Sequence, residues 1–149
     1  MKNSIISLFE EQFKSSPKFV VRSPGRVNLI GDHTDYNDGF VLPMAICHAV
    51  WVGFTPTEDR TVTLYSKDFN ESLSFSLDKI ENSGQSWLEY VKGIANGLQS
   101  RGLPLKGFKG VIQSDLPIGA GLSSSAAFEM AAIKCLLQND ESKLNTSEM

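Results

Sequence analysis

The feature that most constrains the fold is a succession of strand-like runs in the first half of the chain. Residues 73–77 alternate leucine or phenylalanine with serine, and residues 61–64 alternate threonine with valine or leucine. This period of two buries one face of a β-strand, and the polar stretch 67–71 between the two runs predicts a hairpin. Residues 19–21 and 40–55 precede them as further apolar, β-branched runs. The first half of the chain is therefore expected to consist mainly of consecutive strands.

Other stretches show helical periodicity instead. Apolar residues recur at helical spacing in residues 5–13, and again behind the capping-box pattern Ser86-Trp87-Leu88-Glu89, which predicts a helix that ends near Gly102. Residues 108–115 predict another strand, and residues 125–138 predict a helix rich in small apolar side chains. Runs of consecutive strands mixed with helices favour the α+β class over a doubly wound parallel sheet.

The size and charge of the chain argue against several classes of protein, including nucleic-acid-binding and membrane proteins. A chain of 149 residues is long enough for one domain with a real core, and its formal net charge of −3 offers no basic surface for nucleic acid or anionic lipid. The longest apolar stretch, residues 40–54, contains Pro43 and His48 and is shorter than the roughly 18 residues that a membrane span needs. No signal peptide is visible either, so the sequence predicts a soluble, cytoplasmic protein.

The two cysteines, Cys47 and Cys135, each lie inside an apolar run and far apart in sequence. They form neither a CxxC pair nor a disulfide framework, and we expect two buried, reduced thiols. His48 stands alone in an apolar run and is expected to be a core residue with satisfied hydrogen bonds.

Residues 115–127, which we call the glycine–serine segment, require a chemical interpretation. They contain the run Pro117-Ile118-Gly119-Ala120-Gly121-Leu122-Ser123-Ser124-Ser125-Ala126-Ala127. The glycines allow positive φ, and a helix that starts directly after them points its unpaired N–H groups into the turn, where an anion is favoured. The segment lacks the GK[ST] ending of a Walker A motif, so it would be a different phosphate cradle. The alternative is a tight turn in which one serine only caps the helix.

A second polar region follows the first strand, which Ser23-Pro24-Gly25 is expected to end, and it is expected to form a loop. Residues 26–39 contain Arg26, three aspartates and His33. Carboxylates accept short charge-assisted hydrogen bonds from the hydroxyls of a sugar, and histidine either donates or accepts. An arginine nearby can stabilise charge on a phosphoryl group. Metal binding by Asp-His-Thr-Asp at 32–35 is a competing interpretation, but the sequence has no second cluster of ligands, and residues 37–39 are typical of a polar turn.

Residues 24–46, which we call the signature segment, resemble the galactokinase family of GHMP small-molecule kinases. The resemblance lies in Arg26-Val27-Asn28-Leu29-Ile30-Gly31-Asp32-His33-Thr34-Asp35-Tyr36-Asn37 and continues through Gly39-Phe40-Val41-Leu42-Pro43-Met44-Ala45-Ile46. The glycine–serine segment is similar to the phosphate loop of the superfamily. The resemblance implies that residues 1–149 form a GHMP-kinase amino-terminal domain of the ribosomal-protein-S5-domain-2-like fold, with a mixed or antiparallel sheet packed with helices.

The resemblance also implies roles for individual residues. The galactose-contacting positions are Asp32, His33, Thr34 and Asp35, where the family usually has glutamate in place of Asp32. Arg26 falls on the arginine that stabilises the transferring phosphoryl group, and Ser125 falls on the serine that binds Mg²⁺. The implied ATP contacts are Ser66, Gly119, Ala120, Gly121, Leu122, Ser123, Ser124 and Ser125.

The implied reaction transfers a phosphoryl group from MgATP to the C1 hydroxyl of D-galactose and gives galactose 1-phosphate, in an enzyme expected to act as a monomer. The catalytic aspartate, the second Mg²⁺-binding carboxylate and the third motif of the family are expected to lie beyond residue 149, in a carboxy-terminal domain. Asp115 is no substitute, because it precedes the phosphate loop. The chain alone is therefore expected to lack useful kinase activity.

Two other functions stay open on the sequence. One is a kinase of the same superfamily for a related sugar such as N-acetylgalactosamine. The other is a non-catalytic protein that senses sugar and ATP, although the intact serine run favours an enzyme.

Overall fold

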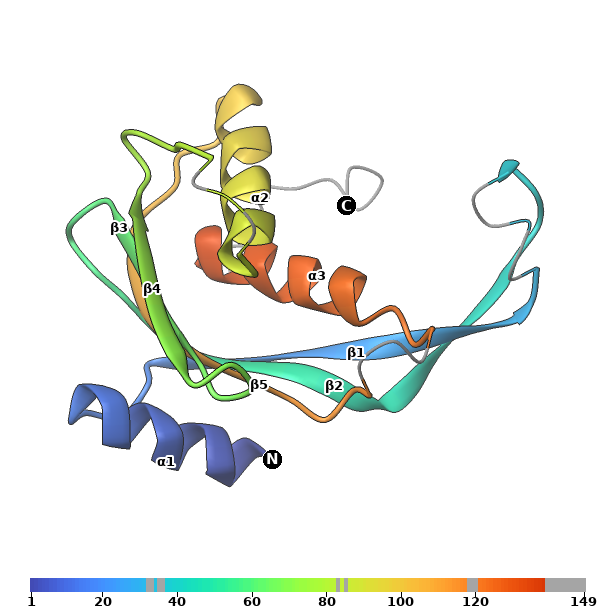
Figure 1. Cartoon of the computed structure of the whole chain (residues 1–149), viewed down its shortest axis with the longest axis horizontal. Helices are drawn as coiled ribbons and strands as arrows, with labels where there is room; N and C mark the ends of the chain where they lie inside the picture. Colours follow the sequence, from blue (N-terminus) through green and yellow to red (C-terminus); the bar gives the residue numbers. More distant parts are fainter. Residues whose placement is uncertain (32–33, 35–36, 83, 85, 118–120, 139–149) are drawn as a thin grey trace.

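The computed structural model describes residues 1–31, 34, 37–82, 84, 86–117 and 121–138. Figure 1 shows the elements in chain order. They are α1 (Lys2–Phe13), β1 (Phe19–Ile30), β2 (Leu42–Pro56), β3 (Thr61–Ser66), β4 (Glu71–Ser76), α2 (Leu88–Ser100), β5 (Phe108–Ser114) and α3 (Ser124–Leu136).

The described strands form one five-stranded sheet in the order β1-β2-β5-β3-β4. Neighbouring strands are antiparallel except β3 and β5, which are parallel. The parallel pair arises because the chain leaves the edge strand β4 through α2 and returns to the middle of the sheet as β5. The sheet is therefore mixed, as expected for the α+β class, and the predicted β3–β4 hairpin is confirmed.

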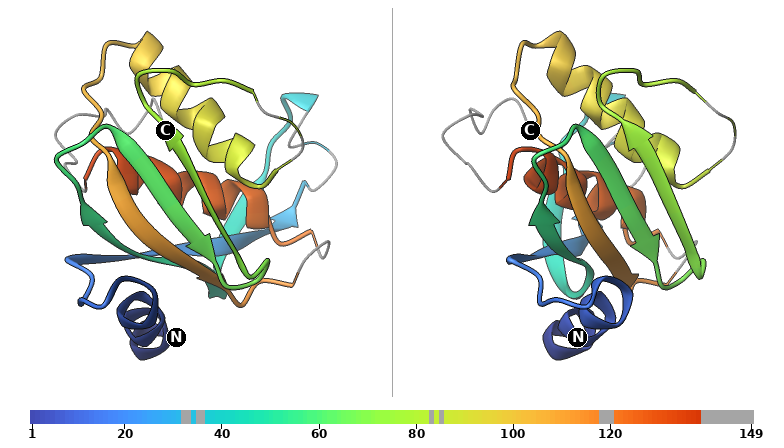
Figure 2. Two further views of the ribbon diagram at one scale, coloured as in Figure 1. Left: turned by 60° about the vertical axis from the view of Figure 1, so that its left-hand side comes forward. Right: turned by 90° about the vertical axis from the view of Figure 1, so that its left-hand side faces the viewer.

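Helices lie on both faces of the sheet. Figure 1 shows α2 and α3 over one face and α1 beneath the other, and the rotated views in Figure 2 keep this arrangement. The larger core lies between the sheet and α2 and α3, with Phe54 and Phe108 fully enclosed. A smaller cluster holds α1 through Ile5 and Phe9 against Val111 of β5. Each such side chain contributes about 1.5–3 kcal/mol when it leaves water.

The predicted helices are confirmed with small shifts at their ends. Helix α1 follows the periodicity of residues 5–13. Helix α2 begins at Leu88 with Trp87 at the N-cap, one residue later than the capping pattern predicts, and the predicted capping box does not form. Ser86 instead precedes the helix, where its Oγ accepts the Leu88 N–H at 3.1 Å and its carbonyl accepts the Glu89 N–H at 3.0 Å. Helix α2 stops just before Gly102, whose φ of 75° ends the helix. No helix among the described residues is long and apolar enough to cross a bilayer.

The expectation that Ser23-Pro24-Gly25 ends the first strand is wrong, because β1 continues to Ile30. Proline is tolerated there since β1 is an edge strand and its register with β2 shifts between Pro24 and Arg26. The loop expected over residues 26–39 is correspondingly shorter, and Arg26 lies on a strand rather than in a loop.

The extended backbone expected for residues 40–55 is confirmed, but its first half is exposed rather than buried. Both Cys47 and His48 are exposed, so the predictions of a buried thiol and a core histidine at these positions are wrong. Cys135 on α3 is buried as predicted, and burial raises the pKa of its thiol.

Candidate functional site

The amino-terminal end of α3 presents unpaired backbone donors. Helix α3 begins at Ser124, and the Ala127 N–H donates to the Ser123 carbonyl at 3.0 Å, as in a first helical turn. The N–H groups that precede this bond have no carbonyl partner within the helix, and together with the helix dipole they favour an anion. Ser125 is exposed on this first turn.

The cap of this helix supports an anion site over a simple turn. Ser123 occupies the N-cap position with φ 55° and makes no side-chain capping bond. The alternative in which this serine merely caps the helix therefore fails for Ser123. Gly121 has φ 68°, a left-handed conformation that favours glycine, and none of the described atoms lies within 4 Å of where its Cβ would be. Gly119 and Ala120 lie outside the described residues.

The signature segment meets this helix end directly. Arg26 is exposed on β1, and its backbone N–H donates to the Leu122 carbonyl at 3.2 Å. The strand that carries the predicted phosphoryl-binding arginine is thus bonded to the loop that carries the predicted phosphate donors. Asp32, His33 and Asp35, the predicted sugar contacts, lie outside the described residues.

Thr34 organises the connection between β1 and β2. Its Oγ1 lies 3.0 Å from the Gly31 carbonyl oxygen and 3.1 Å from the Phe40 carbonyl oxygen, and the two oxygens share the single hydroxyl proton. Its own carbonyl accepts the N–H groups of Asn37 and Gly39, each at 3.0 Å. The hydroxyl therefore fixes backbone in this structure, a role that the sequence did not indicate, and its contact with a sugar stays a prediction.

Ser66 is the last residue of β3, which pairs with β5, the strand that leads into the glycine–serine segment. It is only 3% exposed, and its Oγ accepts the Phe69 N–H at 3.4 Å. The turn that follows is held to β5, because Asp68 Oδ2 accepts the Ser114 N–H at 3.2 Å. Burial raises the pKa of the Asp68 carboxyl, and the Ser114 hydrogen bond lowers it by less. Ser66 thus supports the turn, and its contact with a nucleotide stays a prediction.

Asp115 anchors the start of the glycine–serine segment. Its Oδ1 accepts the Ala49 N–H at 2.6 Å, and its Oδ2 lies 3.7 Å from His48 Nδ1. The carboxylate extends the pairing of β2 and β5 past the end of β5. Asp115 thus has a structural role here, and its exclusion as a catalytic base stays a prediction.

A cluster of aromatic side chains flanks α3, and sequence reasoning missed its surface character. Phe69 and Trp87 stack with centroids 6.3 Å apart and planes 2° apart, and Trp87 Nε1 donates to Glu71 at 3.1 Å. Trp87 and Tyr90 both lie 6.4 Å from the ring of Phe128 on α3. Phe69 and Tyr90 are exposed. Trp87 is only partly buried against the core, and helical periodicity carries no signal for its exposed neighbour Phe69 from the β3–β4 turn.

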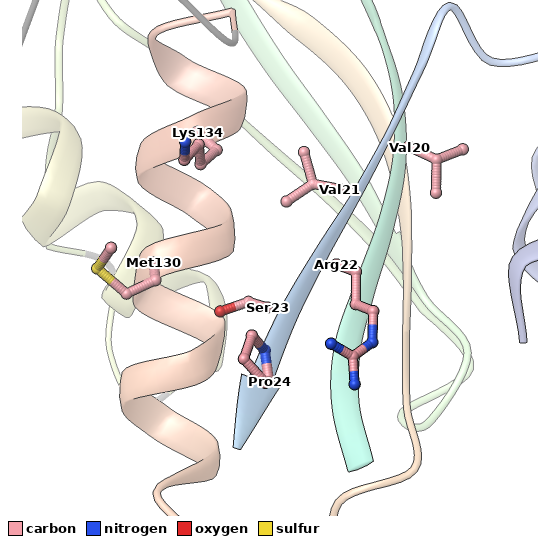
Figure 3. Close-up of a pocket in the computed structure, with 7 residues that line it drawn as sticks. All are labelled: Val20, Val21, Arg22, Ser23, Pro24, Met130 and Lys134. Carbon is pink, nitrogen blue, oxygen red and sulfur yellow. The ribbon is translucent and has the colours of Figure 1, made fainter. Parts of the chain in front are cut away.

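Two open cavities adjoin α3. One, of about 450 Å³, lies between β1 and α3 and is lined by Val20, Val21, Arg22, Ser23, Pro24, Met130 and Lys134. Figure 3 shows its two walls, with Val21, Ser23 and Pro24 on β1 and Met130 and Lys134 on α3. The other, of about 470 Å³, lies between α2 and α3 beside Tyr90. Within the described part of the chain, no three histidine, cysteine, aspartate or glutamate side chains gather as a metal site.

Comparison with known families divides the chain between two matches. The galactokinase galactose-binding signature matches residues 7–56, which include β1 and β2. The amino-terminal domain of the GHMP kinases matches residues 89–149, which include α3. Residues of the two matches contact each other along the pairing of β2 with β5 and at the hydrogen bond between Arg26 and Leu122.

Similar proteins agree with this division. A galactokinase of Chloroflexus aggregans is 49% identical over 130 residues, which are 87% of this chain and 33% of that protein. A galactokinase of Pyrococcus furiosus is 50% identical over 121 residues, 81% of this chain and 34% of that protein. The chain therefore spans about a third of the length of these curated relatives.

Solved structures share the fold. The galactokinase of Lactococcus lactis complexed with galactose has a TM-score of 0.84 and 36% identity, covering 97% of this chain and 38% of that one. The mevalonate kinase of Methanococcus jannaschii has a TM-score of 0.72 and 28% identity, covering 91% and 44% of the two chains.

Proposed function

Since the chain belongs to the galactokinases within the GHMP kinases, we propose that it supplies the phosphate cradle and sugar-recognition segment of an enzyme that phosphorylates D-galactose. The reaction transfers the γ-phosphoryl group of ATP to the C1 hydroxyl and yields galactose 1-phosphate. The observation that carries the proposal is the hydrogen bond between Arg26 and Leu122, which joins the signature strand to the glycine–serine segment.

The nucleotide is proposed to bind at the start of α3. Backbone N–H groups and the hydroxyls of Ser123, Ser124 and Ser125 donate to phosphate oxygens, with Gly119, Ala120, Gly121 and Leu122 supplying the turn. The exposed faces of Phe69 and Tyr90 stand on the flank of the same helix and suit a purine, which stacks on aromatic rings.

Magnesium is proposed to accompany ATP at Ser125. The residue fits the ion, because its hydroxyl is a hard oxygen ligand exposed on the first turn of α3. Mg²⁺ binds through few protein ligands plus substrate phosphates, so one serine is a reasonable contribution from this chain. When bound, the ion neutralises phosphate charge.

Galactose is proposed to bind through the signature segment. Asp32 and Asp35 accept hydrogen bonds from sugar hydroxyls and His33 donates or accepts, so a sugar with a misplaced hydroxyl would leave a polar group unpaired. The exposed side chain of Arg26, at the junction with the cradle, stabilises charge on the transferring phosphoryl group. The complex of the Lactococcus lactis galactokinase with galactose supports this choice of sugar.

The test is made in the whole protein that carries this chain. Asp35→Ala is expected to abolish most galactose turnover, and Arg26→Ala is expected to lower kcat more than it weakens galactose binding, because its interaction forms in the transition state. A near-normal kcat/KM in Asp35→Ala, or equal losses of kcat and sugar binding in Arg26→Ala, would contradict the assigned roles.

We also propose a cytoplasmic, monomeric enzyme. The two free cysteines, one of them exposed, are compatible with a reducing compartment. Sedimentation of the whole protein and fractionation of cells test these two points.

A further inference from the structure

Residues on both sides of the turn in the glycine–serine segment contact β1 at one residue, Gly25. Leu116 lies before the turn and Leu122 after it, and each has an atom against the position where a Cβ on Gly25 would stand. The next residue, Arg26, donates its N–H to Leu122. The contact lies on the edge of the sheet, because β1 is the outermost of the strands that the structure describes.

Position 25 favours glycine because there is no space for a side chain, and not because of its backbone conformation. It is buried and does not have a positive φ. A Cβ added to it would lie 2.8 Å from the Leu122 carbonyl oxygen and 3.3 Å from Ile46 Cδ1, and it would overlap Leu116 Cδ2. A leucine side chain can rotate away, but the backbone carbonyl moves only if the loop moves with it.

The affected carbonyl is the one that holds the loop to β1. Moving the Leu122 oxygen outward lengthens its 3.2 Å hydrogen bond with the Arg26 N–H. Leu122 is followed at once by Ser123 and the first turn of α3, so the same movement shifts the N–H groups that face the proposed phosphate site.

We propose that Gly25 is a positioning residue, whose missing side chain lets the Leu122 carbonyl dock on Arg26 and so sets the distance between that arginine and the start of α3. The inference rests on the proposed function, since the arginine and the helix end act on one nucleotide there. Misplacement of a phosphate-binding group by about 1 Å is enough to cost up to about 10²-fold in activity.

Three glycine-to-alanine variants of this chain separate positioning from a loss of stability. Gly25→Ala is the test. Gly53→Ala is the matched control on a neighbouring strand, because the atoms nearest to its Cβ would be those of Ile5 and Pro17, at an ordinary contact distance of 3.5–3.6 Å. Gly107→Ala is the steric control, because its Cβ would lie 2.7 Å from Thr61 N in a turn that does not contact Arg26.

Two readouts are taken by NMR on labelled protein. Hydrogen exchange of the Arg26 amide, relative to the Val111 amide in the core, reports the docking bond. Titration with MgATP, followed at the Ser124 and Ser125 amides, reports the phosphate site. Gly25→Ala is expected to accelerate relative exchange at Arg26 and to weaken MgATP binding, each by about tenfold. Gly53→Ala is expected to stay near wild type in both readouts. Gly107→Ala is expected to lower the melting temperature, while its relative exchange at Arg26 and its affinity for MgATP stay within about twofold of wild type.

The proposal is overturned if Gly25→Ala keeps wild-type exchange at Arg26, or if Gly107→Ala reproduces both losses. Should Gly25→Ala fail to fold, Gly25→Ala with Leu116→Ala removes the side-chain overlap and leaves the carbonyl contact, so the same expectations apply to that double variant. If the wild-type Ser124 and Ser125 amides do not respond to MgATP, the proposed nucleotide role of this chain fails, and the exchange comparison still decides whether Gly25 sets the docking bond.

Discussion

Phe54 and Phe40 lie at opposite ends of the β2 region and have opposite surroundings. Phe54 is fully buried, with its ring 5.2 Å from Phe19 and 5.7 Å from Phe108. Phe40 is 100% exposed where β1 passes into β2. We call residues 27–45 the arm, and the rest of the sheet with its helices the body. The other exposed large apolar side chains in the described part of the arm are Leu29, Ile30, Val41, Leu42 and Met44.

The difference between arm and body teaches that strand pairing and burial are separate requirements. β1 and β2 pair along the arm as they do in the body, through Val27 and Met44 among others. Figure 1 shows that this end of the two strands extends past α2 and α3. Backbone pairing therefore shapes the arm, while the packing energy that fixes the fold lies in the body. Arg26 and the start of α3, joined through Leu122, stand at their boundary.

The largest expected effect tests that division of energy. Phe54→Ala should lower the free energy of unfolding by about 3–5 kcal/mol, because it removes a ring enclosed by two others and leaves a cavity. Phe40→Ala, the matched variant in the arm, should leave it unchanged, since the ring has no packing to lose. Urea unfolding followed by circular dichroism measures both. A comparable loss in Phe40→Ala would show that the arm stabilises the fold.

The same division explains how far the sequence predicted this structure. Helix α1, the β3–β4 hairpin and α2 were predicted because each buries only one face. Apolar residues then recur in the sequence with the period of a helix or of a strand. The course of β1 past Pro24 was not predictable, since it depends on a partner strand some twenty residues away in sequence. The exposure of Cys47 and His48 was missed because an apolar run does not reveal whether a helix will cover it.

The site shows a similar limit. The helix start after the glycines was predicted from local residue types, and the structure has α3 there. The contact of Leu122 with Arg26 could not be predicted, because it joins residues about a hundred positions apart through backbone atoms. A contact between backbone atoms affects the choice of residue type only where it leaves no space for a side chain, as at Gly25.

A second prediction concerns order within the arm. Thr34→Val should accelerate amide exchange of Asn37 and Gly39 by roughly tenfold, equivalent to a hydrogen bond of about 1 kcal/mol, because the hydroxyl no longer holds the carbonyls of Gly31 and Phe40. Thr34→Ser keeps the hydroxyl and is the control. The melting temperature should stay the same in both variants, since the body is untouched. Equal acceleration in the serine variant would show that the hydroxyl is not what orders the connection.

A third prediction concerns strain at the junction of arm and body. Ser123 has a left-handed backbone conformation with φ 55°, and its side chain makes no capping hydrogen bond that would offset the strain energy of this conformation. Ser123→Gly should therefore raise the free energy of unfolding by about 0.5 kcal/mol, the relief of strain less the added freedom of the unfolded chain. Ser124→Gly, at a position with ordinary helical backbone, should lower it. A loss of stability in Ser123→Gly would mean that the serine hydroxyl stabilises the helix end.

The smallest expected effect lies in the body, where Asp68 holds the β3–β4 turn to β5. Burial raises the pKa of this carboxyl above 3.8, so the folded protein binds its proton more tightly than the unfolded chain does. A group of this kind stabilises the fold when it is protonated, below pH 3.8, and that contribution is lost as the pH rises through the folded-state pKa.

Asp68→Asn should remove this pH dependence, because the amide oxygen still accepts the Ser114 N–H and carries no charge to desolvate. The variant should be slightly more stable than wild type at neutral pH, and the gain should shrink toward zero as the pH falls below 3.8. The gain stays small because water still reaches the carboxylate of this exposed residue and screens it. Urea unfolding of both proteins across this range measures the difference. A variant that is less stable at neutral pH would mean that the charge on Asp68 strengthens its bond to β5 by more than its burial costs.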